Sequence, residues 1–217
     1  MRPSRKEDLI DGATRVFERT GFHATSLDTI LAEAGVSRMT LYNHFESKED
    51  LIVAALERYG QRSRAHMFER IRSATDDPRE RLLSVFDELG AWLTGGAFSG
   101  CMFARACAEF DAESSPVRRV AAQHCRLIAE GLAEIAAEAD LSDPDEVGRQ
   151  LAMLRAGAIE IAREIGSERA GFVASTARAA ARAIVDAHRV PNQDNDQDGN
   201  GDNSRDNTGD QRSSTLQ

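Results

Sequence analysis

The sequence has few of the features that would indicate a membrane, secreted or metal-binding protein. No run of about 18 apolar residues occurs, so no membrane-spanning helix is expected. The start of the chain, MRPSRKEDLIDGA, is charged and lacks the apolar core of a signal peptide, which predicts a cytoplasmic protein. The three cysteines, Cys101, Cys107 and Cys125, have no metal-ligand spacing, and an odd number does not favour a disulfide framework. We therefore expect neither a metal nor a cofactor.

Proline is also scarce, with five in 217 residues, and no stretch alternates apolar and polar residues as a strand would. The supply of Ala, Glu, Arg and Leu favours helices instead. These patterns predict an all-α protein of about nine helices, with three short helices at the front and a larger bundle behind. The net charge of −9 argues against a generally cationic surface, although a local basic patch can lie on an acidic body.

Apolar spacing and capping residues set the expected helix boundaries. The predicted helices cover about 4–20, 25–34, a brief stretch after 37, 47 to the low seventies, 78–92, 102–110, 116–139, 144–165 and 167–187. Thr25 is expected to cap the second helix, with Asp28 as its capping-box partner. Gly35 is expected to end that helix, and Ser37 and Ser47 can cap the next two.

The segment 191–217 differs in composition from the rest of the chain. It contains one aliphatic residue, Leu216, together with six Asp and two Arg. Such a segment buries too little apolar surface to offset the entropy of ordering, so we expect a disordered acidic and polar tail. The stretch from Asp194 to Gly199 is similar to a calcium loop, but no Glu stands at the twelfth position and no amphipathic helix follows. A solvated tail is therefore the favoured interpretation.

The segment from Thr25 to Asp50 has the layout of a helix-turn-helix. Two short helices would be joined through Ala34-Gly35-Val36-Ser37, where glycine allows the positive φ of a sharp turn. In this geometry the second helix lies in the DNA major groove and leads with its N-terminal residues. The residues expected to face outward from it are Arg38, Met39, Thr40, Tyr42, Asn43 and His44, whereas Leu41 and Phe45 should face inward.

These outward side chains suit DNA. Arginine can pair with guanine, and threonine can contact a base edge or a thymine methyl group. Tyr42 and His44 can donate to phosphates, and Lys48 stands at the start of the next helix, where it can reach a phosphate. An ordinary solvated helical hairpin is the alternative. It is disfavoured because Arg, Thr, Tyr, Asn and His are not the usual solubilising set of Glu and Lys.

One set of residues in this part of the chain matches a known pattern over about the first 55 residues without a gap. It consists of Gly21-Phe22, Thr25, Ile30, Ala34-Gly35-Val36-Ser37, Leu41-Tyr42, His44-Phe45, Ser47-Lys48-Glu49 and Leu51. The pattern resembles the N-terminal domain of TetR-type transcriptional repressors. The resemblance implies a DNA-binding domain at 1–47 and an effector-binding and dimerisation domain at 48–190. It also implies a homodimer on a palindromic operator of double-stranded DNA.

The resemblance also divides the candidate DNA-binding residues by role. Positions that touch DNA in such proteins match Thr25, Ser37, Thr40, Tyr42, His44 and Lys48. Positions at which members vary match Arg38, Met39 and Asn43, so Arg38 and Met39 are expected to set operator specificity.

A second, weaker similarity lies further along the chain. Ser99-Gly100-Cys101-Met102-Phe103 and Ala108-Glu109-Phe110 are similar to a segment of one large branch of this family, in which some members sense reactive electrophiles through the matching cysteine. Cys101 would lie near a helix N-terminus, where the dipole lowers the pKa of a thiol, with Arg105 one turn on. A repressor that senses electrophiles or oxidants through Cys101 is thus one interpretation. The favoured one is that Cys101, like Cys107 and Cys125, is a packing residue.

An effector pocket is expected in the helical bundle. His124 is the polar exception on the inward face of the helix after Pro116, and it could bond an effector or a neighbouring helix. The candidate effector-binding residues are Trp92, Phe98, Cys101, Met102, Phe103 and His124. Plain core packing is the alternative for these side chains. An apolar or aromatic small molecule suits them better than a phosphate-bearing one, because no glycine-rich phosphate loop occurs.

The last two predicted helices suggest contact with a second copy of the chain. Apolar residues cover more than one face of 144–165, and 167–187 is rich in alanine, so backbones can approach closely. A four-helix homodimer interface is the prediction, and a monomeric bundle is the alternative.

The leading interpretation is a transcriptional regulator, most often a repressor, that a small-molecule inducer releases from its operator. An enzyme is disfavoured because no nucleophile–base pair, metal motif or nucleotide loop occurs. A helical protein-interaction module is the third class.

Overall fold

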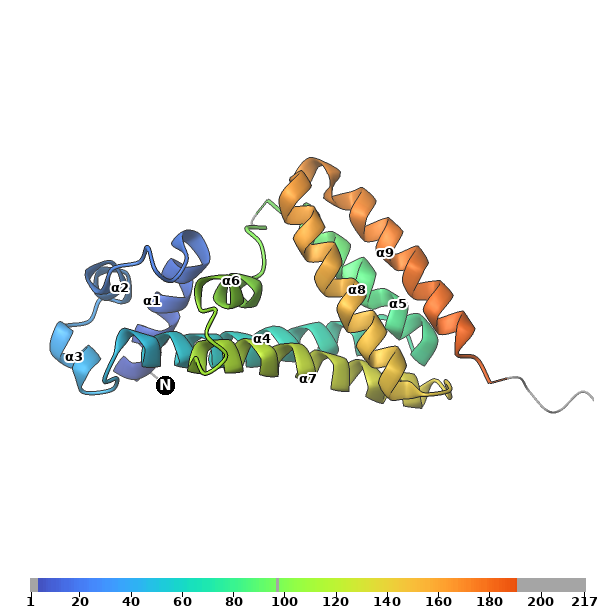
Figure 1. The fold of residues 1–217 in the computed structure, drawn as a ribbon, viewed down its shortest axis with the longest axis horizontal. Helices are drawn as coiled ribbons and strands as arrows, with labels where there is room; N and C mark the ends of the chain where they lie inside the picture. The colour runs from blue at the N-terminus through green and yellow to red at the C-terminus, as the bar shows by residue number, and fades with distance from the viewer. Residues whose placement is uncertain (1–3, 97, 191–217) are drawn as a thin grey trace, which may run out of the picture.

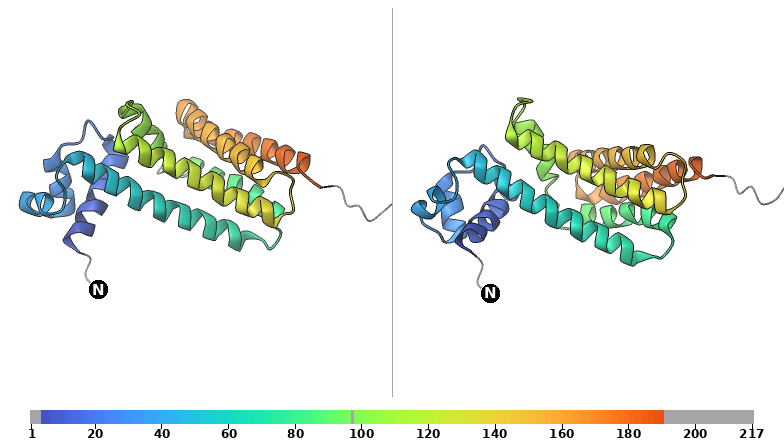
Figure 2. Two further views of the ribbon diagram at one scale, coloured as in Figure 1. Left: turned by 60° about the horizontal axis from the view of Figure 1, so that its bottom comes forward. Right: turned by 90° about the horizontal axis from the view of Figure 1, so that it is seen from below.

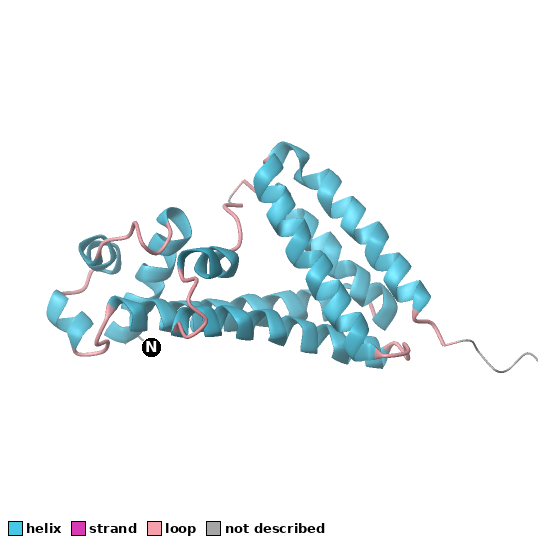
Figure 3. Ribbon diagram, in the orientation of Figure 1, coloured by secondary structure: helices cyan, strands magenta, loops and turns pink. Residues whose placement is uncertain are grey.

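The computed structural model describes residues 4–96 and 98–190, and within these ranges it contains nine helices and no strand (Figure 1). The helices are α1 (Arg5–Thr20), α2 (Leu27–Ala34), α3 (Arg38–Tyr42), α4 (Lys48–Ala74), α5 (Pro78–Thr94), α6 (Met102–Glu109), α7 (Pro116–Glu138), α8 (Pro144–Ile165) and α9 (Ser167–Ala187). Figure 3 shows loops of varied length between them. The predicted all-helical class is confirmed. The predictions for 191–217 lie outside the described residues.

The start of α2 corrects the sequence-based prediction. Ser26, and not Thr25, is the N-cap, and its side chain accepts a hydrogen bond from the amide of Thr29. The side chain of Thr25 is buried instead, and its hydroxyl donates to the carbonyl of Gly21 at 2.6 Å. The predicted capping box of Thr25 with Asp28 was therefore wrong, because the Thr25 hydroxyl turns back toward the end of α1, where it bonds the Gly21 carbonyl and lies 2.6 Å from the Thr20 hydroxyl.

Three short helices form a small domain with the first turns of α4. Leu41 and Phe45 are buried as predicted, at 1% and 7% exposure, and they join the core that Leu51 and Leu56 of α4 complete. Gly35 ends α2 at a φ of 64°, a left-handed conformation that favours glycine and makes the sharp turn into α3. No clean break separates this domain from the bundle, because α4 contributes to both cores.

The bundle is built on two long helices. Figures 1 and 2 show α4 and α7 side by side along the molecule, with α1, α2 and α3 at one end and α5, α8 and α9 at the other. Helix α6 lies between these two groups and packs on α7. Its residues Met102, Phe103 and Ala106 belong to the same apolar core as α1 and α2. No helix in the described ranges is long and apolar enough to cross a membrane.

Candidate nucleic-acid interface and small-molecule pocket

Helix α3 presents its side chains to solvent at one end of the molecule. Met39 and Tyr42 are 75% and 55% exposed, which is unusual for large apolar or aromatic side chains. Arg38, Asn43 and His44 are exposed as well. The structure thus brings the predicted residues from 37 to 44, apart from the inward Leu41, onto one short surface.

The cap of α3 uses side chains that were predicted to touch DNA. The Ser37 hydroxyl accepts a hydrogen bond from the amide of Thr40 at 3.2 Å and lies 3.0 Å from the Thr40 hydroxyl. Arg38 forms an ion pair with Asp28 of α2, and this pair raises the pKa of the guanidinium. Both partners are exposed, so a stronger acceptor can exchange with Asp28 easily.

Two predicted residues lie differently from the α3 group. Thr25 is 4% exposed, so its side chain does not reach the surface. Lys48 donates from Nζ to the carbonyl of Phe22 at 2.6 Å, and burial lowers the pKa of its ammonium, against a smaller opposing effect of Glu109. In this arrangement Lys48 fastens α4 to the turn after α1. Helical spacing in the sequence does not indicate this contact, because the two residues lie 26 positions apart.

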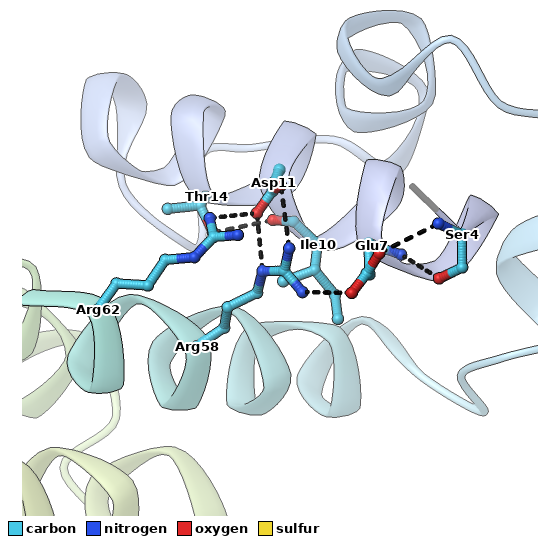
Figure 4. A network of polar contacts seen from close by, with 7 residues as sticks. All are labelled: Ser4, Glu7, Ile10, Asp11, Thr14, Arg58 and Arg62. Atoms are coloured by element: carbon cyan, nitrogen blue, oxygen red, sulfur yellow. Dashed lines mark hydrogen bonds and ion pairs between the residues drawn. The ribbon is translucent and has the colours of Figure 1, made fainter. Parts of the chain in front are cut away.

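Helix α1 is tied to α4 by a network of charges (Figure 4). Arg58 pairs with Glu7 at 3.3 Å and with Asp11 at 2.9 Å, and Arg62 pairs with Asp11 at 3.0 Å. Glu7 also completes a capping box with Ser4, which fixes its carboxylate at the start of α1. Helix α1 also packs on α2 and contacts α3, so this network links α4 to the end of the molecule that presents α3.

A second connection joins the end of the molecule that carries α3 to α6. The carboxylate of Glu109 accepts hydrogen bonds from the backbone amides of Phe22 at 3.0 Å and His23 at 2.6 Å. The His23 ring nitrogen Nε2 lies 2.6 Å from the Glu109 carbonyl, and the ring stacks on Phe110 with centroids 4.8 Å apart. We call these contacts the Glu109 latch. The latch holds the turn between α1 and α2 against the end of α6.

Arg105 strengthens the same connection. Its guanidinium donates to the carbonyls of Phe17 at 3.2 Å and Glu18 at 3.1 Å, in the last turn of α1, where a positive charge suits the helix dipole. It also donates to Ser99 at 3.3 Å. Arg105 was predicted to lie one turn from Cys101 and to act on its thiol. The structure instead commits its donors to these three carbonyls.

The bundle encloses a cavity of about 350 Å³ between α4, α5, α6, α7 and α8. Five of the six predicted effector residues line it, namely Trp92, Cys101, Met102, Phe103 and His124. Phe98 does not line this cavity, because its ring packs edge-on against Trp92 with centroids 4.9 Å apart.

Sequence reasoning missed most of the polar residues in the cavity wall. They are Tyr59, Ser63, His66, Arg70, Glu88 and Arg155. The α4 members recur at helical spacing, which could have identified them as one face of that helix. No pattern local to α8 distinguishes Arg155 from the exposed arginines of the same helix. Arg70 and Glu88 pair across the cavity rim at 2.5 and 2.7 Å.

His124 is held in a neutral state at the cavity wall. It is 7% exposed, and its ring stacks on Phe103 with centroids 3.6 Å apart and an interplanar angle of 7°. Arg64 of α4 donates to its Nδ1 at 2.9 Å, so the ring proton lies on Nε2. Burial, Arg64 and Arg155 together lower the pKa of His124 to about 3. The predicted bond to a neighbouring helix is present, and a bond to an effector stays a prediction.

The three cysteines are free and lie in different surroundings. Cys101 is the N-cap of α6, is partly buried and lines the cavity, but its side chain makes no capping hydrogen bond. Cys107 is partly buried, and burial raises the pKa of its thiol. Cys125 is exposed on α7, so the expected packing role was wrong for this residue.

Comparison with known proteins agrees with this geometry. The family model described as bacterial regulatory proteins of the tetR family matches residues 9–55, which cover most of α1, all of α2 and α3, and the start of α4. The activator FasR of Mycolicibacterium smegmatis, an HTH-type transcriptional regulator, is 38% identical over 86 residues, or 40% of this chain and 39% of FasR. The chain matches 19 to 56% of the length of its first curated relatives.

Solved structures extend the likeness to the bundle. SCO4454, a TetR-family transcriptional regulator from Streptomyces coelicolor, has a TM-score of 0.74 at 29% identity over 85% of this chain and 95% of that one. CifR, a TetR-family regulator whose cysteine mutant was solved with 26-bp operator DNA, shares the fold with a TM-score of 0.69 at 24% identity over 82% of this chain and 99% of that one.

The exposed helix α3 and the matched residues 9–55 show a helix-turn-helix domain of the kind that HTH-type transcriptional regulators carry. Residues 9–55 thus match the tetR family, and the whole described fold is similar to that of TetR-family regulators.

Proposed function

We propose that this protein is a repressor that binds a palindromic operator as a homodimer and that a small molecule in the bundle cavity releases it. Residues 1–47 would form the DNA-binding domain and residues 48–190 the effector-binding and dimerisation domain. The observation that carries this proposal is the position of α6. Its first residues line the cavity, and its last residue, Glu109, forms the latch on the turn between α1 and α2.

The proposed DNA contacts come from α3 and the helix starts beside it. Arg38, Met39 and Thr40 would read base edges, because the N-terminal residues of a recognition helix point into the major groove. Tyr42 and His44 would donate to phosphates, and Asn43 would lie beside them. The Ser37 and Ser47 caps leave the first amides of α3 and α4 near the same surface, where they suit phosphate. Lys48 would exchange the Phe22 carbonyl for a phosphate.

The proposed dimer interface lies on α8 and α9. Met153, Ile161 and Ile165 of α8 are 70%, 51% and 40% exposed, and Phe172 of α9 is 73% exposed. Large apolar side chains gathered on two adjacent helices favour contact with another protein surface. A second copy of the chain would cover both helices in an isologous four-helix interface and would double the DNA contacts.

Release by the effector requires two arrangements of the DNA-binding domains. A ligand shifts an equilibrium only by its difference in affinity for the two states. A ligand against Cys101, Met102 and Phe103 would displace α6, and the latch would pass that displacement to the DNA-binding domain. The ion pairs of Arg58 with Glu7 and Asp11 would carry α1 along with α4.

Selection of binding sites from random DNA by the purified full-length protein tests the proposal. A palindromic site should be enriched, and Tyr42→Ala should bind it at least about tenfold more weakly. Arg19→Ala, which removes an exposed side chain of α1 in the same domain, should bind like the wild type. The proposal fails if no palindrome is enriched, or if Tyr42→Ala binds with wild-type affinity.

A thiol sensor acting through Cys101 is the second candidate. It is favoured by the position of Cys101 at the start of α6 and on the cavity wall, where an adduct would press on the same helix. N-ethylmaleimide should then abolish operator binding by the wild type and spare Cys101→Ser. If the treated wild type binds its operator unchanged, this candidate is excluded.

A further inference from the structure

The cavity contains a cation that no carboxylate of the described residues neutralises. Arg155 of α8 lines the cavity and is partly buried, and among the described residues it has neither an ion pair nor a hydrogen bond. The ionisable groups that act on it are Cys101, Cys125 and Tyr59, and burial lowers the pKa of its guanidinium. Guanidinium stays protonated at neutral pH, so the cavity holds a positive charge with no counter-ion among the described residues.

The other ionisable groups described below do not neutralise the charge of Arg155. Arg70 and Glu88 neutralise each other through two hydrogen bonds. His124 is neutral at physiological pH, and Tyr59 is neutral because burial raises its pKa to about 12. Arg64 approaches His124 from the opposite side and adds a second positive charge nearby.

We infer that the effector is a small apolar or aromatic molecule carrying one carboxylate, which pairs with Arg155 while its apolar part lies against Trp92, Met102 and Phe103. This inference rests on the proposed ligand-binding role of the cavity and names the class of ligand. A guanidinium and a carboxylate match in a planar, two-bond geometry, which makes the pair strong and directional. A phosphate dianion would carry two charges against the single charge of Arg155, and the described residues that line the cavity include no glycine.

The N-terminus of α6 lies on the same wall and suits the same group. Cys101 gives α6 no side-chain cap, so the first amides of this eight-residue helix lack that partner. An anion near Arg155 would also be favoured by the positive end of the α6 dipole. The carboxylate would therefore connect α8 with the helix whose far end carries the Glu109 latch. The charged group, more than the apolar part, would thus drive release.

Matched acids and amides test the inference. Octanoate and 4-phenylbutyrate are titrated against their primary amides, with the fluorescence of Trp92 as the readout, since it is the one tryptophan of the sequence and lines the cavity. At least one acid should bind the wild type about tenfold or more tightly than its amide. Arg155→Gln should remove this preference and Arg155→Lys should keep part of it. Arg149→Gln, on the same helix but exposed and paired with Glu146, should keep all of it.

The outcomes separate this inference from the proposed function. A wild type that prefers neither acid over its amide overturns the inference, whatever the variants do, and so does a preference that survives Arg155→Gln. The same compounds are then added to the protein bound to its selected operator. Acids that bind through Arg155 without releasing DNA refute the ligand-released repressor but leave the assignment of Arg155 as a carboxylate-binding residue of the cavity standing. If acids and amides release the DNA equally well, the carboxylate inference is refuted and the ligand-released repressor stands.

Discussion

The buried histidine beside the cavity makes the stability of this protein depend on pH in a way that a single substitution can isolate. His124 has a folded-state pKa of about 3, well below its ordinary value of 6.5. Between these two values the unfolded chain binds a proton that the folded chain does not. Stability from this residue is therefore complete above about pH 6.5 and is lost as the pH falls toward 3. Acid favours unfolding because protonated His124 would face Arg64 and Arg155 in a buried site.

The loss of stability depends on how far the pH lies below 6.5, the ordinary pKa of histidine. At pH 5 the unfolded histidine is protonated and the folded one is still neutral, so the loss is about 1.5 pH units at 1.36 kcal/mol each, or about 2 kcal/mol. This figure does not depend on the folded pKa as long as that value lies well below 5. The low exposure of His124, 7%, means that solvent screens its neighbours little.

Urea unfolding at pH 7.5 and pH 5.0, at one protein concentration, measures this loss. Wild type should lose about 2 kcal/mol more than His124→Asn between the two pH values. Asparagine can place an acceptor where Nδ1 accepts from Arg64, and it does not titrate. Contributions of other carboxylates and histidines cancel in the difference. Equal losses in the two proteins would refute the claim that His124 is buried and neutral.

Three further predictions concern the latch, the helix packing and the dimer. Glu109→Gln should keep the affinity for a cavity ligand, read from Trp92 fluorescence, within about twofold of the wild-type affinity. The same ligand should release operator DNA from this variant less effectively. Release at the ligand concentrations that release the wild type would contradict the role of the latch. Gly148→Ala should lower the free energy of unfolding by about 2 kcal/mol or more, because the new Cβ would lie 2.4 Å from the Ala129 carbonyl oxygen of α7; wild-type stability in thermal or urea unfolding would show that α7 and α8 cross less closely. Phe172→Glu should reduce the mass from dimer toward monomer in light scattering at micromolar concentration, whereas Met39→Glu, at a comparably exposed apolar residue on α3, should not; a monomeric wild type, or an unchanged mass in Phe172→Glu, would contradict the proposed interface.

The small N-terminal domain could be predicted in most of its detail. Its helices are short, their caps are local, and Gly35 and Ser47 act on neighbours three or four residues away, so the signal lies within a few positions of the sequence. The exposed and buried sides of α3 follow from helical spacing alone, and Leu41 and Tyr42 fall on the predicted sides.

Prediction failed where a hydroxyl found an unexpected partner. Thr25 has the right residue type and position for a helix cap, yet its hydroxyl bonds to the Gly21 carbonyl and Ser26 takes the cap. The phosphate contact of Lys48 stays a prediction, and its bond to the Phe22 carbonyl joins positions too far apart in the chain for local patterns to indicate it. Capping preferences are small enough for packing to override them.

The sequence by itself determined the helices, the caps of α3 and α4, the turn at Gly35 and the outward chemistry of α3, because each depends on residues close together in the chain. Tertiary structure alone decided the cavity and its connections. Arg155 shares a wall with Cys101, and Glu109 bonds amides 86 and 87 residues away, only because α6 and α8 pack where they do. Burial then changes the chemistry of Arg155. An exposed arginine is an ordinary solvated charge, whereas packing desolvates Arg155 and leaves it without a counter-ion among the described residues.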